Sequence, residues 1–370
     1  MKVAIIEINH YQYGLTMSEI FEDYERFFFV TQDMYNKMHQ YNSELCKGEF
    51  LIIDDIEKNC NEIIQVCNKE AIDLFILNPI FDKFEFALKI CENIFCKKII
   101  TIHNLNFWLN ARFRTLKYYK ERKLKQKIVA NIDYIVVEEM VYDYLKNYKP
   151  ILLKKHKFLS IPFTLANKQK NKKFQKENTI LKIVLPGSIH KDRRRYEDVI
   201  ETIHFFAKKQ ANITFSFAGK AIADYGKWVV SELDKANKIH PGIAKYFPIE
   251  ELTTPDMFLK EMETSDLVLS TSIKEFKALG TTEYIGKTKS TGTVHDMTCF
   301  QLPGLLPKHL EIPGNLKGSV FNYSGANELK EILQNLLDKP ELLNDWKKQA
   351  AINSTYFTAA EIKKKLPFLK

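Results

Sequence analysis

The chain has 370 residues, of which 45% are hydrophobic and 27% charged, and its formal net charge at pH 7 is +9. This length predicts two domains, and no apolar stretch approaches the roughly 18 residues that a transmembrane helix needs. The apolar run at the amino terminus is short and interrupted by Glu7, which argues against a signal peptide. We therefore expect a cytoplasmic protein whose positive charge suits nucleic acid, an anionic membrane or a phosphorylated ligand.

The first half alternates short apolar runs with segments of helical spacing. Strands are predicted over residues 2–8, 50–53, 72–77, 98–102 and 134–137. Helices are predicted over residues 15–38, 57–67 and 83–94. Such alternation predicts β-α-β units and a parallel sheet.

A polar, lysine-rich stretch, residues 166–179, is typical of a surface linker. The alternation then resumes. Strands are predicted over residues 180–186, 213–218, 266–270 and 319–323, and helices over residues 196–209, 222–236, 257–263, 327–337 and 340–352. We expect a domain over residues 1–165, a second over 180–352, and a segment over 353–370 that crosses back to the first.

The predicted fold class is α/β, with two doubly wound, Rossmann-like domains facing each other across a cleft. In open α/β sheets, ligands bind beyond the carboxyl ends of the strands. The turns that follow the strands are therefore where functional residues are expected.

Six cysteines are scattered along the chain, with no Cys-x-x-Cys spacing and no accompanying histidine cluster. They are Cys46, Cys60, Cys67, Cys91, Cys96 and Cys299. We expect reduced thiols in or near the cores, and neither a disulfide nor a metal site.

The first strand of the second half ends in a glycine turn with a basic stretch behind it. Gly187 permits a tight turn, and Lys191, Arg193 and Arg194 precede a predicted helix. A helix amino terminus with basic side chains beside it suits a diphosphate. The same stretch also fits a solvated loop capped by Asp192.

A second polar loop, residues 280–297, follows the strand at 266–270. Its backbone N–H groups, hydroxyls and ammonium groups suit phosphate oxygens, although it is not a Walker A loop. The candidate ligands here are Lys287, Lys289, Ser290, Thr291 and Gly292, with Asp296 as acceptor for a ribose diol. A plain surface loop is the alternative.

Together, these turns resemble the donor domain of GT-B glycosyltransferases, especially the large retaining nucleotide-sugar family called glycosyl transferases group 1. That family reads Gly-Arg-x4-Lys-Gly at the first turn, where the Arg and Lys grip the diphosphate. Gly187 matches the glycine and Ser188 replaces the arginine. The basic role would then fall to Lys191, Arg193 or Arg194.

The family also carries a Glu-x7-Glu motif ahead of a Gly-x-Pro turn. Counting back from Pro303 puts the second acid at Asp296, which implies ribose binding, and the first at Thr288, which is a departure. Glu283 is acidic but out of register.

The resemblance also bears on the first half. It implies that His103, which ends a predicted strand, lies near the donor sugar, where a neutral imidazole can orient a hydroxyl or act as general base. A histidine bonded to backbone at a strand end is the alternative. Gly14 and His10 fit the loop that the family places near donor phosphate and acceptor, and a plain loop fits equally well.

Residues 111–127 hold eight Lys or Arg against one Glu, interleaved with apolar residues. As a helix, this stretch would lie on an anionic bilayer surface or pack its apolar stripe on the sheet. We expect no nucleic acid partner, since no binding module accompanies the charge.

The predicted protein is a glycosyltransferase, retaining and independent of metal or cofactor, that moves a sugar from a UDP- or GDP-linked donor. The acceptor would be a glycan or a lipid-linked saccharide in polysaccharide or glycoconjugate synthesis, with the enzyme cytoplasmic or peripheral on the membrane. A nucleotide-sugar epimerase of the same architecture and a non-catalytic nucleotide-sugar-binding subunit are the alternatives. A nicotinamide enzyme is disfavoured because no Gly-x-Gly-x-x-Gly follows the first strand of either half.

Overall fold

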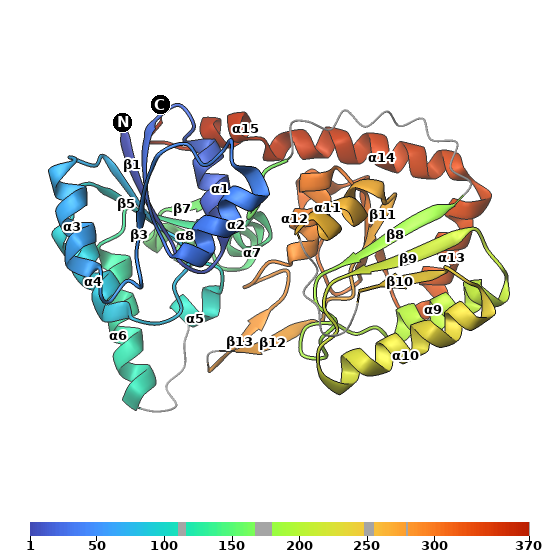
Figure 1. Cartoon of the computed structure of the whole chain (residues 1–370). Coiled ribbons are helices and arrows are strands. Elements are labelled where there is room, and N and C mark those ends of the chain that lie inside the picture. Colours follow the sequence, from blue (N-terminus) through green and yellow to red (C-terminus); the bar gives the residue numbers. More distant parts are fainter. Residues whose placement is uncertain (110–115, 167–179, 248–254, 279, 370) are drawn as a thin grey trace. The chain divides into compact units, whose positions relative to one another are not determined.

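The structure is a computed structural model that describes residues 1–109, 116–166, 180–247, 255–278 and 280–369. The chain forms two compact units (Figure 1). Unit 1 comprises Met1–Thr164, Lys277–Ser290 and Ala359–Lys370, and unit 2 comprises Leu165–Phe276 and Thr291–Thr358. Within the described ranges, no helix is long and apolar enough to cross a membrane. The predicted linker, residues 166–179, lies outside the described residues except for Ala166.

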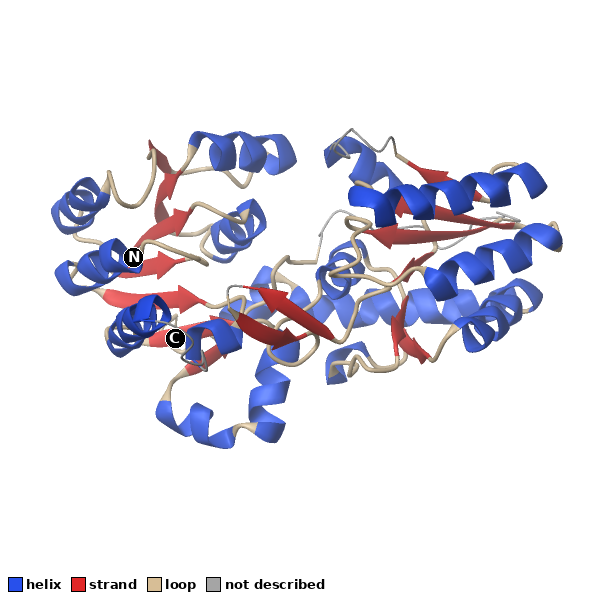
Figure 2. Ribbon diagram, turned by 90° about the horizontal axis from the view of Figure 1, so that it is seen from below, coloured by secondary structure: helices blue, strands red, loops and turns tan. Residues whose placement is uncertain are grey.

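Unit 1 contains a seven-stranded sheet with the strand order β3-β2-β1-β4-β5-β6-β7, and its described pairings are parallel. The strands are β1 (Lys2–Glu7), β2 (Glu25–Val30), β3 (Glu49–Ile52), β4 (Leu74–Leu77), β5 (Lys97–Thr101), β6 (Tyr134–Val137) and β7 (Phe158–Ser160). The central strands are almost continuously apolar because helices cover both faces of the sheet (Figure 2).

The helices of unit 1 follow the strands in turn. They are α1 (Tyr11–Ile20), α2 (Gln32–Asn42), α3 (Cys60–Lys69), α4 (Phe84–Asn93), α5 (Leu105–Leu109), α6 (Leu116–Ala130), α7 (Glu139–Tyr148), α8 (Pro150–Lys155) and α15 (Ala359–Lys365). The last of these comes from the carboxyl-terminal end of the chain and lies against α1, where the ammonium of Lys363 is 2.6 Å from a carboxylate oxygen of Asp23.

The single helix predicted over residues 15–38 is wrong. The structure has α1, then β2, then α2 in this stretch. The aromatic run Phe27–Phe29 is buried in β2, which pairs with β1 in parallel register. Phe21, Phe28 and Met34 fit a helical period by coincidence, and pairing with β1 overrides that local pattern.

Unit 2 contains a six-stranded sheet with the order β10-β9-β8-β11-β14-β15, again parallel in its described pairings. The strands are β8 (Leu181–Pro186), β9 (Ile213–Ala218), β10 (Ala244–Tyr246), β11 (Leu267–Leu269), β14 (Gly304–Pro307) and β15 (Val320–Tyr323). The helices are α9 (Glu197–Lys208), α10 (Ala223–Ile239), α11 (Pro255–Thr264), α12 (Gly292–Phe300), α13 (Ala326–Asp338) and α14 (Pro340–Ser354). The predicted fold class, two Rossmann-like α/β domains with parallel sheets, is confirmed.

A short hairpin lies between β11 and α12 in the sequence. Its strands are β12 (Glu275–Ala278) and β13 (Thr281–Tyr284), which form a two-stranded sheet of their own. Most of this excursion, Lys277–Ser290, belongs to unit 1 although the residues on either side of it belong to unit 2. The chain therefore passes from unit 2 to unit 1 and back within the loop that was predicted to bind the donor.

Candidate functional site

The turn after β8 is built on two glycines whose backbones touch. Gly187 adopts a φ of +91°, a value that favours glycine, and its N–H donates to Ala218 O at 3.1 Å. A Cβ added to Gly219 would lie 2.2 Å from Gly187 O. A side chain at Gly219 would displace backbone, and one at Gly187 would be strained at this φ and would displace the guanidinium of Arg194. The open end of β8 and β9 therefore remains bare peptide.

Arg194 lies across this glycine turn. Its Nη1 donates to Ser188 O at 2.8 Å, and a Cβ on Gly187 would meet the guanidinium at 2.3 Å. Arg193 on the same turn is exposed, with its guanidinium 5.1 Å from the ring centre of Phe276. Lys191 is exposed as well. The structure thus brings together Gly187, Ser188 and Arg194 at the carboxyl end of the unit 2 sheet.

The amino end of α12 lies beside the loop after β11. The hydroxyl of Ser272 is 3.1 Å from the hydroxyl of Thr291, and Ser272 also forms a backbone bridge with Arg194. The basic turn, the loop after β11 and the start of α12 therefore meet at one sheet edge, where Gly292 is the exposed first residue of the helix. The hydroxyls and the helix amino terminus can donate to a diphosphate, and the positive end of the helix dipole favours that charge.

Asp296 lies one turn further along α12 and is half-buried. Burial raises the pKa of Asp296 to about 7, and the nearby charges of His295 and Arg194 oppose that rise. The carboxyl group is therefore close to the basic turn that would hold a diphosphate. It is a suitable acceptor for a ribose diol once it is ionised.

The remaining residues predicted to bind the donor, Lys287, Lys289 and Ser290, lie in the part of the loop that belongs to unit 1. Lys289 Nζ donates to Asn104 Oδ1 at 2.8 Å, and Lys287 Nζ is 5.7 Å from the ring centre of Tyr148. These three residues belong to unit 1, whereas Arg194 belongs to unit 2. Their role in donor binding stays a prediction.

In unit 1, the carboxyl ends of β5 and β6 bring together a histidine and an acid. His103 Nδ1 is 2.8 Å from Glu138 Oε1, and the Tyr13 hydroxyl donates to the same oxygen at 2.6 Å. Glu138 and Tyr13 are buried, and His103 keeps 17% of its side-chain exposure. A carboxylate on Nδ1 fixes the tautomer and the ring orientation of a histidine, which is the arrangement of a general base.

Aromatic rings surround the imidazole. The ring of His10 is centred 5.3 Å from that of His103, and the ring of Phe163 is 6.0 Å away. His10 therefore lies beside His103, and its acceptor-side role stays a prediction. Gly14 is buried inside α1 instead of lying in a loop, and a Cβ there would meet Met38 Sδ at 2.9 Å.

Sequence reasoning missed Glu138, Tyr13 and Glu7. Glu138 directly follows the strand predicted over residues 134–137, so its position at a strand end was a usable signal. Glu7 is the last residue of β1 and fully buried, and its carboxylate accepts from the N–H groups of Asn9 and His10 at 2.8 and 2.6 Å. Burial raises the pKa of Glu7 to about 8 in spite of these hydrogen bonds.

Comparison with known proteins gives structural likeness alone. No protein-family model matches the sequence, and no curated protein matches it. The Anabaena protein HepE in complex with UDP superposes with a TM-score of 0.65 at 10% identity, over 98% of each chain. Sucrose-phosphate synthase from Thermosynechococcus elongatus gives 0.61 at 10% identity, over 100% of this chain and 98% of that one. UDP-GlcNAc 2-epimerase from Neisseria meningitidis bound to UDP-GlcNAc gives 0.54 at 13% identity, over 98% of each chain.

The fold is GT-B. The likeness extends over nearly the whole of this chain and of the three compared proteins, so both Rossmann-like units belong to the match. The predicted GT-B resemblance is thereby confirmed at the level of the fold. The compared GT-B proteins include a synthase and an epimerase, so the fold by itself does not select a reaction.

Proposed function

We propose that the protein is a glycosyltransferase that uses a nucleotide-diphosphate sugar. The observation that carries the proposal is the His103–Glu138 pair at the carboxyl edge of the unit 1 sheet. The glycine turn, Arg194 and the amino end of α12 at the corresponding edge of unit 2 supply the nucleotide half of the site. Some structural neighbours contain UDP or a UDP-sugar, which supports this class of donor.

His103 acts in this scheme as general base. An acceptor hydroxyl passes its proton to Nε2 while Glu138 holds Nδ1, and the freed oxygen bonds to the anomeric carbon. The bond from that carbon to the diphosphate breaks, and its electron pair leaves with the nucleotide. Arg194 and the amino terminus of α12 stabilise the negative charge that develops there.

This role for His103 favours direct displacement with inversion at the anomeric carbon, whereas the sequence resemblance predicts retention. Proton NMR of freshly formed product distinguishes the two outcomes from the anomeric coupling constant. A retained configuration would remove His103 from the role of in-line base and leave the donor half of the proposal intact.

The first experiment measures nucleotide binding by isothermal titration calorimetry with UDP, GDP, CDP and their common sugars. Arg194→Gln should abolish the binding seen in the native protein, because it removes the guanidinium that lies on the glycine turn. Arg195→Gln is the matched control, since that side chain is exposed on the same turn. If no nucleotide binds the native protein, the proposal fails.

A second experiment tests the chemistry. Glu138→Gln should lower turnover by about 10²–10⁴-fold, the usual worth of a positioned acid or base, with little change in nucleotide affinity. Glu139→Gln, at the next residue, is the control. Equal turnover in native protein and Glu138→Gln would contradict the role of the pair.

Epimerisation of a nucleotide sugar is the second candidate function, favoured by the likeness to an epimerase bound to UDP-GlcNAc. The same imidazole would then take a proton from a ring carbon. Incubation of the nucleotide sugar alone in D₂O separates the two reactions. An epimerase incorporates deuterium into the sugar without an acceptor, a transferase does not, and a non-catalytic subunit binds the nucleotide with no reaction in either assay.

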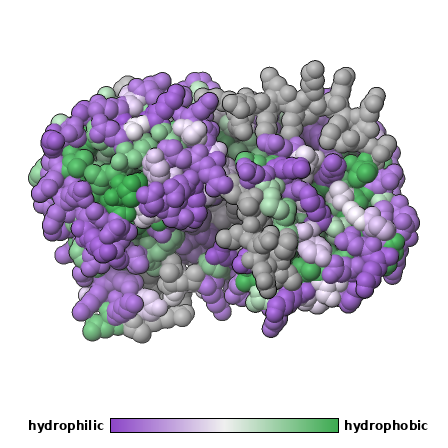
Figure 3. Space-filling view, in the orientation of Figure 1, coloured by the Kyte–Doolittle hydropathy of each residue, from purple (hydrophilic) through white to green (hydrophobic). Residues whose placement is uncertain are grey.

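The acceptor proposed here is a saccharide, free or linked to a lipid. Helix α6 supports contact with an anionic bilayer, because Leu116 and Tyr119 are 72% and 41% exposed on it. Lys117, Lys120 and Lys123 are exposed on the same helix. Figure 3 shows hydrophilic side chains along this helix with a small hydrophobic group at its end. The rest of the predicted basic stretch, residues 111–115, lies outside the described residues.

A further inference from the structure

The excursion 277–290 is bonded to the stretch that directly follows His103. Glu283 on β13 is 1% exposed, and its two carboxylate oxygens accept from the backbone N–H groups of Asn106 and Phe107 at 3.2 and 2.8 Å. These N–H groups lie in the first turn of α5, where no intrahelical acceptor is available. Glu283 therefore caps a helix from a distant part of the sequence.

Further bonds join the same two segments. Leu105 N–H donates to Thr288 O at 2.9 Å, and Asn106 Nδ2 donates to Thr282 O at 2.9 Å. Lys289 Nζ donates to Asn104 Oδ1. Residues 104–107 directly follow His103, and each of them forms a hydrogen bond with a residue of the excursion.

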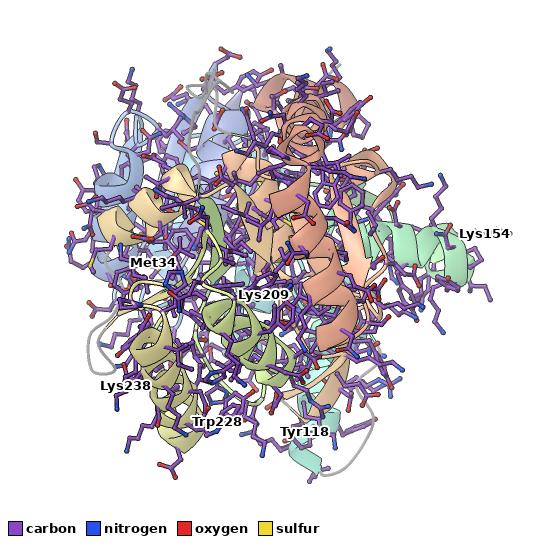
Figure 4. All side chains as sticks on the ribbon, turned by 90° about the vertical axis from the view of Figure 1, so that its right-hand side faces the viewer. Met34, Tyr118, Lys154, Lys209, Trp228 and Lys238 are labelled. Carbon is purple, nitrogen blue, oxygen red and sulfur yellow. The ribbon has the colours of Figure 1, made fainter. Side chains whose placement is uncertain are left out.

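The tip of the hairpin is also seated in unit 1. Gly280 has a φ of +73°, and a Cβ there would lie 2.8 Å from Cζ of Tyr118, which Figure 4 labels on α6. The hairpin therefore has contacts at its tip and along β13. The burial of Glu283 raises the pKa of its carboxyl group, and the donors from α5 and Lys289 oppose that rise. Such a buried, multiply bonded carboxylate is costly to leave unpaired.

The other end of the excursion leads directly into the amino end of α12, which belongs to the proposed nucleotide site. Ser290 is followed by Thr291, which precedes the first residue of α12 and lies 3.1 Å from Ser272. A ligand that fixes the start of α12 therefore acts on the residue next to the excursion.

We propose that Glu283 is a positioning residue for His103, and that the excursion 277–290 transmits nucleotide binding at α12 to the loop carrying that histidine. The inference rests on the proposed function, because it requires a nucleotide diphosphate at the start of α12. In this proposal the nucleotide binds more tightly when the excursion is docked on α5. By thermodynamic linkage, nucleotide binding then increases the population of molecules in which the excursion is docked.

Hydrogen–deuterium exchange of the full-length protein, with and without UDP, tests this coupling. UDP should slow exchange of the amides of residues 105–107 at least about five-fold, the lower end of typical coupling between sites. Glu283→Gln places an amide N–H₂ against a backbone donor, so the slowing should disappear and UDP affinity should fall by a similar factor. Glu275→Gln, exposed on the partner strand of the same hairpin, is the matched control and should behave as the native protein.

The outcomes separate this inference from the proposed function. If UDP, GDP and CDP all fail to bind the native protein, the proposed function fails. If UDP binds but exchange at residues 105–107 is unchanged, or is slowed equally in Glu283→Gln, the coupling is wrong and the donor site stands. Should Glu283→Gln not fold, Asn106→Ala removes the side-chain bonds to Thr282 and Thr288 and must weaken the slowing in the same direction.

Discussion

Two buried acids at strand ends of unit 1 have different surroundings. Glu138 follows β6 and is held by His103 and Tyr13. Glu7 ends β1 and accepts from backbone N–H groups of the next turn, and the side-chain amide of Asn78 also lies beside it. The charge of Glu7 is therefore compensated by dipoles alone, and its burial dominates, which raises its pKa to about 8.

Glu7 gives a prediction about stability. The folded protein holds a proton on Glu7 up to about pH 8, whereas the unfolded chain releases it near the ordinary value of 4.5. Between these values the native state binds more protons, so the free energy of unfolding falls as pH rises. Each unit of pKa difference corresponds to about 1.4 kcal/mol, so the loss across this window is on the order of a few kcal/mol. Glu7→Gln keeps the acceptor oxygen and cannot ionise, so it should flatten this dependence in urea unfolding measured from pH 4.5 to 8.

The control is Glu25→Gln, an exposed acid at the start of β2 that pairs with Lys2. It should leave the slope unchanged, because exposed ion pairs contribute about 1 kcal/mol or less. An equal slope in the native protein and Glu7→Gln would show that Glu7 is not the titrating group.

Asp296 gives a prediction about binding. In the proposed donor site its carboxylate accepts ribose hydroxyls, and its pKa of about 7 leaves it mostly protonated at pH 6. Affinity for UDP-glucose should therefore rise up to about ten-fold between pH 6 and pH 8, as the ionised fraction rises. UDP-glucose is the right ligand because its diphosphate does not titrate in this range. Calorimetry on Asp296→Asn should show weaker binding with no such rise; a rise that persists would assign the titration to another group.

At the scale of the element, the sequence predicted most strands and their parallel arrangement. Apolar runs such as Leu74–Leu77 and Leu181–Pro186 are buried on both faces, and this burial leaves a clear signal. The strand β2 was missed because its aromatic residues also fit a helical period. The hairpin of β12 and β13 was missed because its residues are polar and its contacts lie far away in the sequence.

The site was harder to predict than the fold for a related reason. Gly187 and Arg194 are close in sequence, so a local motif predicted their turn. His103 and Glu138 meet only because β5 and β6 are neighbours in the sheet. Glu283 is an acid close to the Glu-x7-Glu motif in the sequence, but no local sequence pattern indicates that it caps α5. That contact forms only because residues 277–290 belong to unit 1.

Helix α6 gives the prediction at this scale. In flotation assays, the protein should associate with vesicles that contain phosphatidylglycerol and not with phosphatidylcholine alone, because each lysine near an anionic surface contributes about 1 kcal/mol. Added salt should release it. The double variant Leu116→Glu, Tyr119→Glu should lose this association. Ile352→Glu, which changes an exposed apolar residue of α14, should keep it; equal binding to both vesicle types would reject the bilayer contact.

At the scale of the whole molecule, sequence order and structural unit do not coincide. Unit 1 is completed by two later segments of the chain, the excursion 277–290 and the tail 359–370. The tail contributes Ile362 and Leu366, which are 2% and 1% exposed. Residues 1–164 thus contain the sheet and most of its helices. Part of the core of unit 1 and the cap of α5 come from the two later segments.

Deletion of residues 359–370 should therefore destabilise unit 1 selectively. Two buried large apolar side chains are lost, and at roughly 1.5–3 kcal/mol each the cost is about 3–6 kcal/mol. Hydrogen exchange should show loss of protection in α1, against which the tail packs, while β8 and β9 of unit 2 remain protected and UDP still binds. Lys363→Ala removes only a surface ion pair with Asp23 and Glu22, so it should cost no more than about 1 kcal/mol. Uniform loss of protection in both units after the deletion would mean that they unfold as one body, and the tail would then stabilise the whole chain instead of unit 1.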